Sequence, residues 1–198
     1  TFRVAELGRI MERFGTTPIP PYIKDSPLSE KELRTRYQSV FASRKGSVAA
    51  PTASLHFTPR LLAQLKRRGF DAAFVTLHVG LGTFAPLTTQ HLATGTLHKE
   101  RFIINAKTAT FLNRAKREGR PIIAVGTPAL RALESAATAS GRIRARSSTT
   151  SLFIREGYRF KAADGLITNF HVPRSSLLML VSAFAGQGAI MRCYRRAI

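Results

Sequence analysis

The sequence predicts an α/β protein in which helices cover both faces of a sheet. Short apolar runs of strand length, such as 71–79 and 121–125, alternate with longer segments of helical periodicity. The 198 residues include 44% hydrophobic side chains, which is an ordinary share for a globular core. No run of about 18 apolar residues occurs, so the sequence predicts no transmembrane helix.

Local signals place each element along the chain. Ser29 followed by Glu32 forms a capping box, and Thr58 followed by Pro59 is an N-cap with proline at the first helical position. Helical patterns that begin at such caps or end at glycine predict helices over 29–42, 59–68, 106–118, 128–137 and 175–185. Apolar runs predict strands over 71–79, 101–105, 121–125 and 164–168.

Other segments give weaker signals. Residues 2–14 are read as a short strand or a helix, and the prolines of 17–23 make that segment extended. The polar and basic stretch 138–151 predicts a loop or a disordered arm. Residues 151–154 and 158–162 are predicted to pair as a hairpin.

The charge balance favours a polyanionic partner. Lys and Arg total 31 against 11 Asp and Glu, a formal net charge of +20. Nucleic acid is the first candidate for such a surface, and a general preference for arginine is the competing explanation. The single cysteine, Cys193, excludes an internal disulfide, and no signal-peptide pattern opens the sequence, so a cytoplasmic protein is expected.

Three loops that follow strands are candidate ligand sites, because open α/β sheets bind ligands beyond the carboxyl ends of their strands. The first loop carries glycines that let backbone approach a ligand, and the second opens a helix whose N–H groups could hold a carboxylate or phosphate. The third places an amide, an imidazole and a guanidinium at a helix N-terminus, which makes it the strongest candidate. The residues are His78, Gly80, Gly82 and Thr83, then Gly126, Thr127, Arg131 and Glu134, then Asn169, His171 and Arg174.

Further polar residues extend the candidate set. His56 follows a loop of small residues, and His98 and Glu100 alternate on a predicted strand, so both are expected to face one side. Histidines with a glutamate also raise a metal site as an alternative. The sequence contains neither HExxH nor CxxC spacing, so acid–base work is favoured over metal binding.

Basic residues over 142–146 are candidate RNA contacts. Arg142, Arg144 and Arg146 alternate with small or apolar residues ahead of a serine and threonine run. Arginine is well suited to phosphate, although a solvated basic face explains such a segment equally well. Arg131 and Glu134 likewise have an alternative, since residues three apart on a helix often form a surface ion pair.

Taken in order, a set of motifs resembles the S-adenosylmethionine:tRNA ribosyltransferase-isomerase family of queuosine biosynthesis. The matching stretches run from the first residues of the sequence to the last, with spacing close to that of the family. They are PIPPYI at 18–23, RYQ at 36–38, AAPTASLHFT at 49–58, TLHVGLGTFAP at 76–86, HKE at 98–100, AVGT at 124–127 with RALE at 131–134, and LITNFHVPRSSLLMLVSAFA at 166–185.

The resemblance implies a three-layer α/β/α sandwich with a mixed sheet. The family's inserted small β-barrel is expected to be largely absent. Residues 1–14 would be a remnant of the barrel and its return segment, and 15–198 would be the α/β catalytic domain, incomplete at its C-terminal end. Arg174 stands where the family carries lysine.

The resemblance also implies the reaction. The family transfers the ribosyl unit of S-adenosylmethionine to a 7-aminomethyl-7-deazaguanine of tRNA and rearranges it to an epoxy-cyclopentane, while adenine and methionine leave. S-adenosylmethionine is the co-substrate, and no metal is needed. His171, His78 and His56 are then the expected acid–base groups. Arg131 or the amides of Gly126 and Thr127 would hold the methionine carboxylate, and the groups facing the ribose or the cation would be Glu100 or Glu134.

Other functions stay open from the sequence alone. A basic RNA-binding remnant without catalysis, a fragment without independent function and a metal-dependent hydrolase are the alternatives. For the family reaction, the expected partners are tRNA and S-adenosylmethionine, without a membrane, and the expected state is a monomer.

Overall fold

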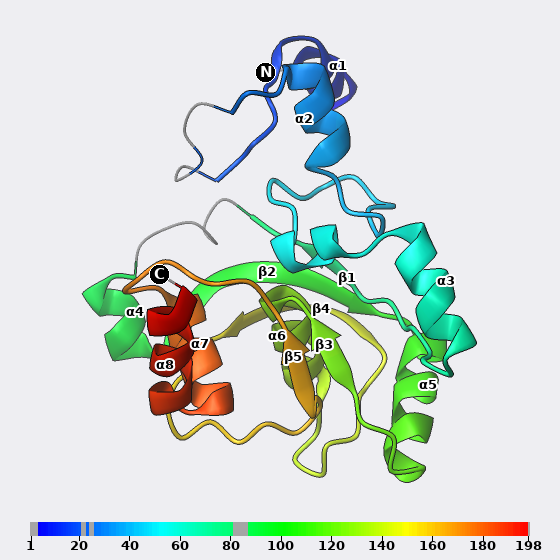
Figure 1. Ribbon diagram of the computed structural model, residues 1–198, viewed down its shortest axis with the longest axis vertical. Coiled ribbons are helices and arrows are strands. Elements are labelled where there is room, and N and C mark those ends of the chain that lie inside the picture. The colour runs from blue at the N-terminus through cyan, green and yellow to red at the C-terminus, as the bar shows by residue number, and fades with distance from the viewer. Residues whose placement is uncertain (1–3, 21–22, 24–25, 81–86, 198) are drawn as a thin grey trace.

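Helices and strands alternate along most of the chain (Figure 1). The structure, a computed structural model, describes residues 4–20, 23, 26–80 and 87–197. Within these residues the helices are α1 Val4–Phe14, α2 Glu30–Arg36, α3 Pro59–Arg67, α4 Thr89–Thr94, α5 Ala106–Arg117, α6 Thr127–Ala136, α7 Ser176–Ala185 and α8 Gln187–Ala197, with a 3-10 helix, η1, at Thr52–His56. The strands are β1 Thr76–His78, β2 Thr96–Ile104, β3 Ile123–Val125, β4 Arg146–Leu152 and β5 Gly165–Ile167.

The described strands form two sheets. β1, β2 and β4 are antiparallel in that order, and Phe102 of the central strand β2 lies opposite Leu77 on one side and Ser148 on the other. β3 and β5 are parallel, with Ala124 opposite Leu166. Figure 1 shows α6 beneath the arch of β2 and β4, and η1 on the other side. The α/β class predicted from the sequence is confirmed.

The core forms where α5, α6 and α7 pack against these strands. Phe102 and Ile104 of β2, Leu130 of α6 and Leu180 of α7 are each exposed by 2% or less. Phe102 and Ile104 are two residues apart and therefore point to the same face of β2. Burial of each such side chain contributes about 1.5–3 kcal/mol. The core thereby fixes β2 and α6, which carry several of the candidate site residues.

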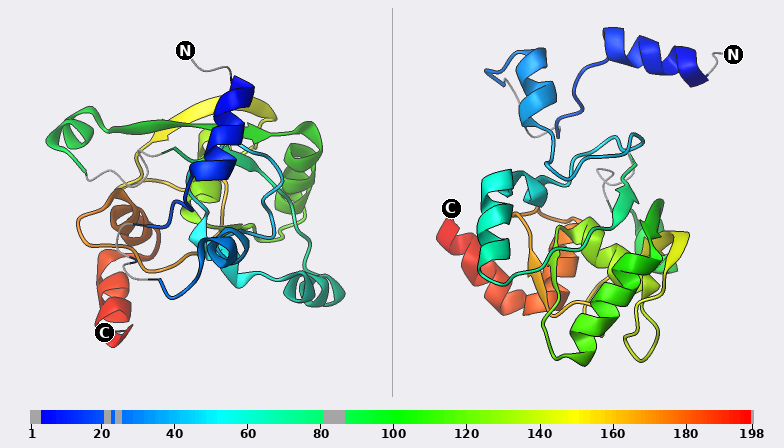
Figure 2. Two further views of the ribbon diagram at one scale, coloured as in Figure 1. Left: turned by 90° about the horizontal axis from the view of Figure 1, so that it is seen from above. Right: turned by 90° about the vertical axis from the view of Figure 1, so that its right-hand side faces the viewer.

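The N-terminal helices stand apart from this core (Figures 1 and 2). Arg34 of α2 joins the two helices, since its guanidinium donates to the carbonyl oxygens of Glu12 at 2.9 Å and Gly15 at 2.5 Å. Met11 and Phe14 of α1 are 63% and 70% exposed. The segment 2–14, left open between strand and helix, is helical from Val4 onward.

α7 and α8 close the C-terminal side of the fold. Ser175 caps α7 by accepting from Leu178 N–H at 3.2 Å, as its position in the sequence predicted. Leu180 and Val181 of α7 are buried in the core. In the part of the chain that the structure describes, no single helix has the length and apolar character of a membrane span. Helices α7 and α8 reach that length and apolar character only when they are taken together, and the chain bends by 115° between them.

Two predicted segments were wrong. Residues 138–151, predicted as a loop or disordered arm, contain most of strand β4, because the polar run Arg146–Leu152 is paired to the long strand β2. The predicted hairpin of 151–154 with 158–162 does not form. The chain turns where Tyr158 N–H donates to Arg155 at 3.0 Å, and Phe160 then packs on Phe184 of α7 at 4.6 Å between ring centroids.

Other elements have different lengths from those predicted. The helix that begins at the Ser29 capping box ends at Arg36 rather than at residue 42. The apolar run 71–79 is a strand only over Thr76–His78. Helix α4 and the first two residues of β2, 96–97, carry no strong sequence signal and were not predicted.

Candidate functional site

Three segments meet at the carboxyl ends of the parallel strands β3 and β5. Gly126, directly after β3, donates its N–H to the carbonyl of Ile167 at the end of β5 at 2.9 Å. Its φ is +89°, and a Cβ there would lie 3.9 Å from Cβ of Pro51, the residue before η1. A glycine tolerates this positive φ, and the distance shows that η1 lies in van der Waals contact with the start of α6. The end of β5, the start of α6 and the start of η1 therefore converge where open α/β folds bind ligands.

His56 and Asn169 contact one another at this place, although 113 positions separate them in the chain. Nε2 of His56 lies 2.7 Å from Oδ1 of Asn169. An amide oxygen only accepts hydrogen bonds, so Nε2 carries the proton and Nδ1 is left as a proton acceptor. His56 is exposed and Asn169 half-buried, so the pair is open to a ligand.

His171 lies in the same loop as Asn169 and is half-buried. Its Nε2 lies 3.1 Å from the hydroxyl oxygen of Thr168. Burial lowers the pKa of the His171 imidazole below its usual value of 6.5, which keeps the ring neutral at pH 7. A neutral imidazole can accept a proton, as a general base must.

Tyr194 of α8 holds the backbone of this loop. Its hydroxyl accepts from the N–H of His171 at 2.6 Å and donates to the carbonyl of His171 at 3.1 Å. The Tyr194 ring also packs edge-on against Phe170, with 4.8 Å between centroids. We call His56, Thr168, Asn169, His171 and Tyr194 the histidine cluster.

Arg174 follows the histidine cluster in an unusual conformation. Its φ is 55°, the one positive value among the described residues other than glycine. Non-glycine residues in this region carry strain of order 1 kcal/mol. The side chain is exposed beside the N-terminus of α7, so the guanidinium is available to an anionic group.

Glu100 and Arg131 form a buried ion pair between β2 and α6. Nη1 of Arg131 lies 2.8 Å from Oε2 of Glu100, and the two side chains are 6% and 4% exposed. The guanidinium also donates through Nε to the carbonyl of Leu152 at 3.1 Å. Burial lowers the pKa of Arg131, while the neighbouring Glu100 raises it and so offsets part of that shift. This pair joins β2, α6 and the end of β4 rather than facing solvent.

Glu134 is fully engaged by the protein itself. Its carboxylate accepts from the Tyr158 hydroxyl at 3.1 Å and from the N–H groups of Lys161, Ala162 and Ala163 at 2.9, 2.9 and 3.3 Å. Burial and the carboxylate together raise the pKa of Tyr158. Among the described contacts, Glu134 forms no ion pair with Arg131, which was the alternative considered from the sequence. Glu134 instead fixes the segment that follows the 155–158 turn.

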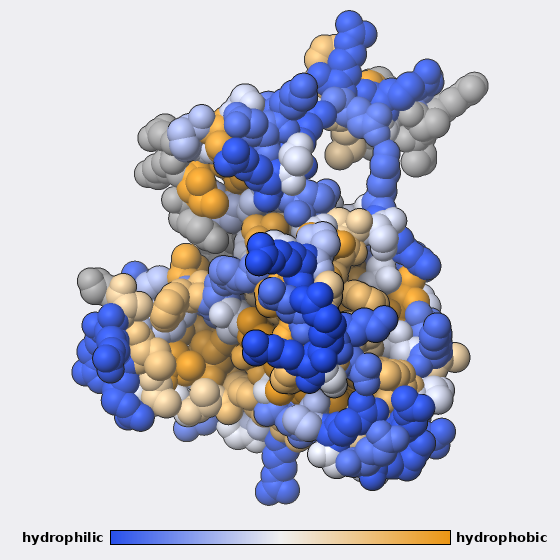
Figure 3. Space-filling model, turned by 45° about the vertical axis from the view of Figure 1, so that its right-hand side comes forward, coloured by the Kyte–Doolittle hydropathy of each residue, from blue (hydrophilic) through white to orange (hydrophobic). Residues whose placement is uncertain are grey.

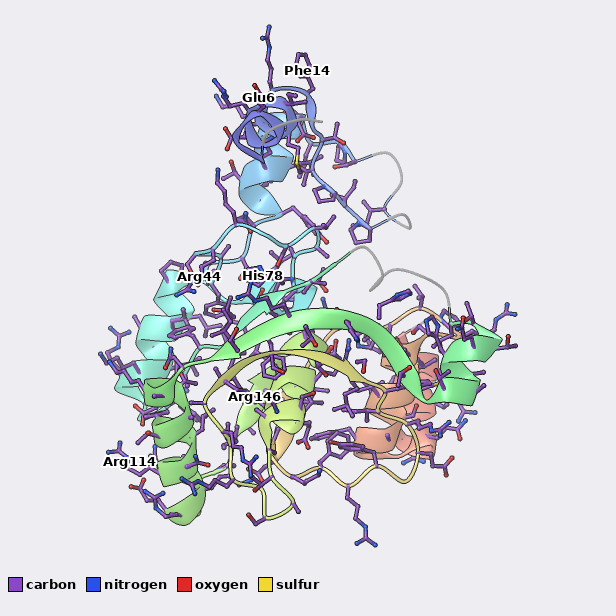
Figure 4. The ribbon with its side chains drawn as sticks, turned by 180° about the vertical axis from the view of Figure 1, so that it is seen from behind. Glu6, Phe14, Arg44, His78, Arg114 and Arg146 are labelled. Carbon is purple, nitrogen blue, oxygen red and sulfur yellow. The ribbon has the colours of Figure 1, made fainter. Side chains whose placement is uncertain are left out.

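The structure places the remaining histidines elsewhere. A Cβ on Gly46 would lie 2.7 Å from Nδ1 of His78, so the 44–48 turn covers that ring (Figure 4). His98 is exposed and packs edge-on against His91 of α4 at 5.0 Å. His98 is exposed whereas Glu100 is 4% exposed, and an irregularity in the β2–β4 pairing falls between Thr96 and Glu100, so a shared face for His98 and Glu100 remains a prediction.

Of the glycine loop after β1, only Gly80 belongs to the described residues, and it is half-buried. Gly82 and Thr83 lie outside them. Thr127 is 4% exposed at the start of α6, and the N–H of Gly126 is already bonded to Ile167. Direct anion binding by these amides is therefore limited.

The predicted RNA contacts lie away from the cluster. Arg142 and Arg144 are exposed on the segment between α6 and β4. Arg146 opens β4, where its guanidinium donates to Ser148 Oγ at 2.9 Å (Figure 4).

Sequence reasoning did not select Tyr194. Its only local signal is a place in the amphipathic pattern of α8, 23 positions after the residue that it holds. A hydroxyl inside an otherwise apolar and basic helix pattern was the one available hint.

Comparison with known proteins agrees with the fold. Residues 1–198 match the family described as queuosine biosynthesis protein. The S-adenosylmethionine:tRNA ribosyltransferase-isomerases of Moorella thermoacetica and Citrifermentans bemidjiense are each 50% identical to this chain over 96% and 95% of its length. The chain spans only 54% of either relative, about half of their length.

A solved structure gives the same result. The crystal structure of the S-adenosylmethionine tRNA ribosyltransferase from Thermotoga maritima is 39% identical and superposes with a TM-score of 0.58. The match covers 73% of this chain and 45% of that one. With the family match over its whole length, this chain belongs to the family of queuosine biosynthesis proteins.

Proposed function

We propose that this chain carries the acid–base centre of an S-adenosylmethionine:tRNA ribosyltransferase-isomerase. The reaction would move the ribosyl unit of S-adenosylmethionine to the 7-aminomethyl-7-deazaguanine of tRNA with isomerisation, giving epoxyqueuosine-tRNA. The observation that carries the proposal is the convergence of His56, Asn169 and His171 at the carboxyl ends of β3 and β5. The names of relatives at 50% identity supply the substrate class.

His171 and His56 are the proposed acid–base groups. The reaction needs a base for a proton on the carbon beside the sulfonium and an acid for the departing adenine. His171 is suited to the first role, because burial keeps its imidazole neutral. His56 presents Nδ1 once Nε2 is bonded to Asn169, so it can receive and return a proton at that atom.

Arg174 is the proposed anchor for the methionine carboxylate. A guanidinium binds a carboxylate through two parallel hydrogen bonds, and this one is exposed next to the histidine cluster. Arg131 is less suited, since its guanidinium is buried against Glu100 and Leu152. Glu100 and Arg131 would instead keep β2 and α6 in register behind the site.

The remaining parts of the proposal concern the setting of the reaction. We propose catalysis without a resident metal, because the described residues contain no group of three His, Cys, Asp or Glu side chains placed to share an ion. We also propose a cytoplasmic monomer that acts on tRNA, which the names of its relatives give as a substrate. Residues 1–14 and 15–198 would be the return segment and the catalytic domain.

The test mixes the protein with S-adenosylmethionine and tRNA that bears 7-aminomethyl-7-deazaguanine. Chromatography then measures the adenine that is released. The proposal predicts release that depends on this tRNA. The second candidate, a basic RNA-binding remnant, is favoured by the net charge of +20. It predicts tRNA binding without any adenine release, and that result would overturn the enzymatic proposal.

A further inference from the structure

A groove runs between α5 and the segment that joins α6 to β4. Its volume is about 660 Å³. None of its lining residues belongs to the histidine cluster, and α5 lies across the molecule from α7 and α8 (Figures 1 and 2). The polar lining consists of the side chains of Thr110, Asn113, Thr138, Ser140, Arg142 and Arg144.

The wall of the groove that carries the arginines is held in place. Asn113 of α5 donates to the carbonyl of Ile143 at 2.7 Å and accepts from its N–H at 2.8 Å. The Ile143 side chain is 1% exposed, so the residue between the two arginines is anchored in the core. Arg144 N–H donates to Ala136 at 3.0 Å, and Arg142 N–H donates to Thr138 Oγ1 at 3.1 Å. Both guanidinium groups are thus presented to solvent from a fixed backbone.

The charge of this region has one sign. Residues 138–148 contain no carboxylate, and Glu118 is the one carboxylate of 105–120. Glu118 is already engaged by Arg114 at 3.6 Å and Arg120 at 2.8 Å. Hydrophilic side chains gather over the C-terminal end of α5 in Figure 3. An adjoining hollow of about 350 Å³ is lined in part by Lys107 and Arg114 and extends the basic surface.

We propose that this groove binds the phosphodiester backbone of the substrate RNA, at a distance from the reacting base. This inference rests on the proposed function for the identity of the RNA. Guanidinium groups bind phosphate oxygens through paired hydrogen bonds, and the hydroxyls of Thr110, Thr138 and Ser140 add neutral donors of the kind that protein–nucleic acid interfaces use. A backbone that is already fixed lowers the entropy lost on binding. The groove therefore supplies affinity and orientation, while the histidine cluster supplies the chemistry.

The test compares two double variants that lose the same charge. Arg142→Ala with Arg144→Ala removes the groove arginines, and Arg67→Ala with Arg68→Ala removes two exposed arginines at the end of α3. Binding of an unmodified tRNA transcript is measured without S-adenosylmethionine over a range of salt concentrations. At low salt, the groove variant is expected to bind tRNA ~10-fold more weakly than the wild type, and the control variant ~3-fold more weakly or less. The slope of log K against log salt should become shallower by about two in the groove variant.

A third variant tests the fixed geometry without changing charge. Asn113→Ala removes both hydrogen bonds to Ile143 and should weaken tRNA binding several-fold while the circular dichroism spectrum stays that of the wild type. Equal losses in both double variants, or unchanged affinity in the groove variant, would overturn the inference. So would a groove variant that loses affinity for phosphatidylglycerol vesicles and keeps it for tRNA. If tRNA binding depended on the groove but no adenine were released, the proposed function would be wrong and the inference about the groove would stand.

Discussion

His171 shows how its surroundings set the protonation and the orientation of one side chain. The imidazole is half-buried, its pKa is lowered by burial, and its backbone is held through both polar atoms by the Tyr194 hydroxyl. Thr168 fixes the ring through Nε2 at 3.1 Å. A base that is neutral and oriented before substrate arrives needs no reorganisation during the reaction.

Tyr194→Phe is expected to act as a positioning variant. The ring contact with Phe170 is kept, but both hydrogen bonds to His171 are lost, so kcat for adenine release should fall by about 10-fold with a smaller change in KM. Tyr158→Phe is the control, because it also removes one hydroxyl bond, to Glu134, away from the cluster. Steady-state kinetics of both variants give the comparison. Equal effects on kcat would show that Tyr194 does not position His171.

The buried pair of Glu100 and Arg131 makes a different prediction, on stability. Glu100→Ala leaves a guanidinium that is 6% exposed without its carboxylate, which is expected to cost about 3–5 kcal/mol of unfolding free energy. Glu12→Ala removes an exposed partner of Lys45 and should leave stability unchanged within error. Urea denaturation measures both. A Glu100→Ala protein as stable as the wild type would mean that the pair does not hold β2 to α6.

At the scale of elements, α5 and α7 both begin at side-chain caps. Asn105 starts α5 by accepting from Thr108 N–H at 2.8 Å, and Ser175 starts α7 by accepting from Leu178 N–H at 3.2 Å. The loop of the histidine cluster leads directly into α7, whereas α5 lies beside the groove. Equal local chemistry at the two caps should therefore have unequal effects on activity.

Ser175→Ala and Asn105→Ala are each expected to lower stability by about 1 kcal/mol. Only Ser175→Ala should also slow adenine release, by several-fold, because it loosens the start of α7 beside Arg174. Thermal unfolding gives the first quantity, and chromatography of adenine gives the second. If Asn105→Ala slowed adenine release as much as Ser175→Ala, the slower release would not come from the start of α7, and the prediction would be wrong.

Elements with local signals could be predicted, and those made by distant pairing could not. The Ser29, Thr58 and Ser175 caps mark helix starts because each side chain bonds its own helix. Strand Arg146–Leu152 lacks apolar alternation and is a strand because β2 lies beside it. The 155–158 turn replaces the predicted hairpin since the segment after it is held by Glu134.

The same limit applies to the site. The loop Thr168–Arg174 was selected from its composition, and the structure places His56 beside it. The contact of His56 with Asn169 spans 113 positions, which no spacing rule connects. Glu134 resembled a ligand group in sequence, but its four donors come from a segment more than 20 positions away. Residue type indicated the chemistry, and only the fold showed which groups are free.

At the scale of the whole molecule, the stability of the protein should depend on pH through His171. Its folded-state pKa lies below the unfolded value of 6.5, so the unfolded chain binds more protons between these values. The stabilisation is therefore fully present above pH 6.5 and is lost as the pH falls through the folded-state pKa. Melting temperature against pH should show a smaller fall for His171→Gln than for wild type. An identical profile for the two proteins would contradict a buried neutral imidazole.

The groove and the histidine cluster are built from different elements of the molecule. The groove between α5 and 138–145 presents arginines from a fixed backbone, and the cluster at the ends of β3 and β5 carries the imidazoles of His56 and His171. The chain spans about half the length of the relatives that it matches.

The central claim is that the histidine cluster performs the acid–base chemistry. The most direct measurement is the rate of adenine release from S-adenosylmethionine with modified tRNA, for the wild type, His171→Asn, His56→Asn and the exposed control His98→Asn. We expect losses of about 100-fold or more for the two cluster variants and little change for the control. Wild-type rates in either cluster variant, or no tRNA-dependent release by the wild type itself, would contradict the claim.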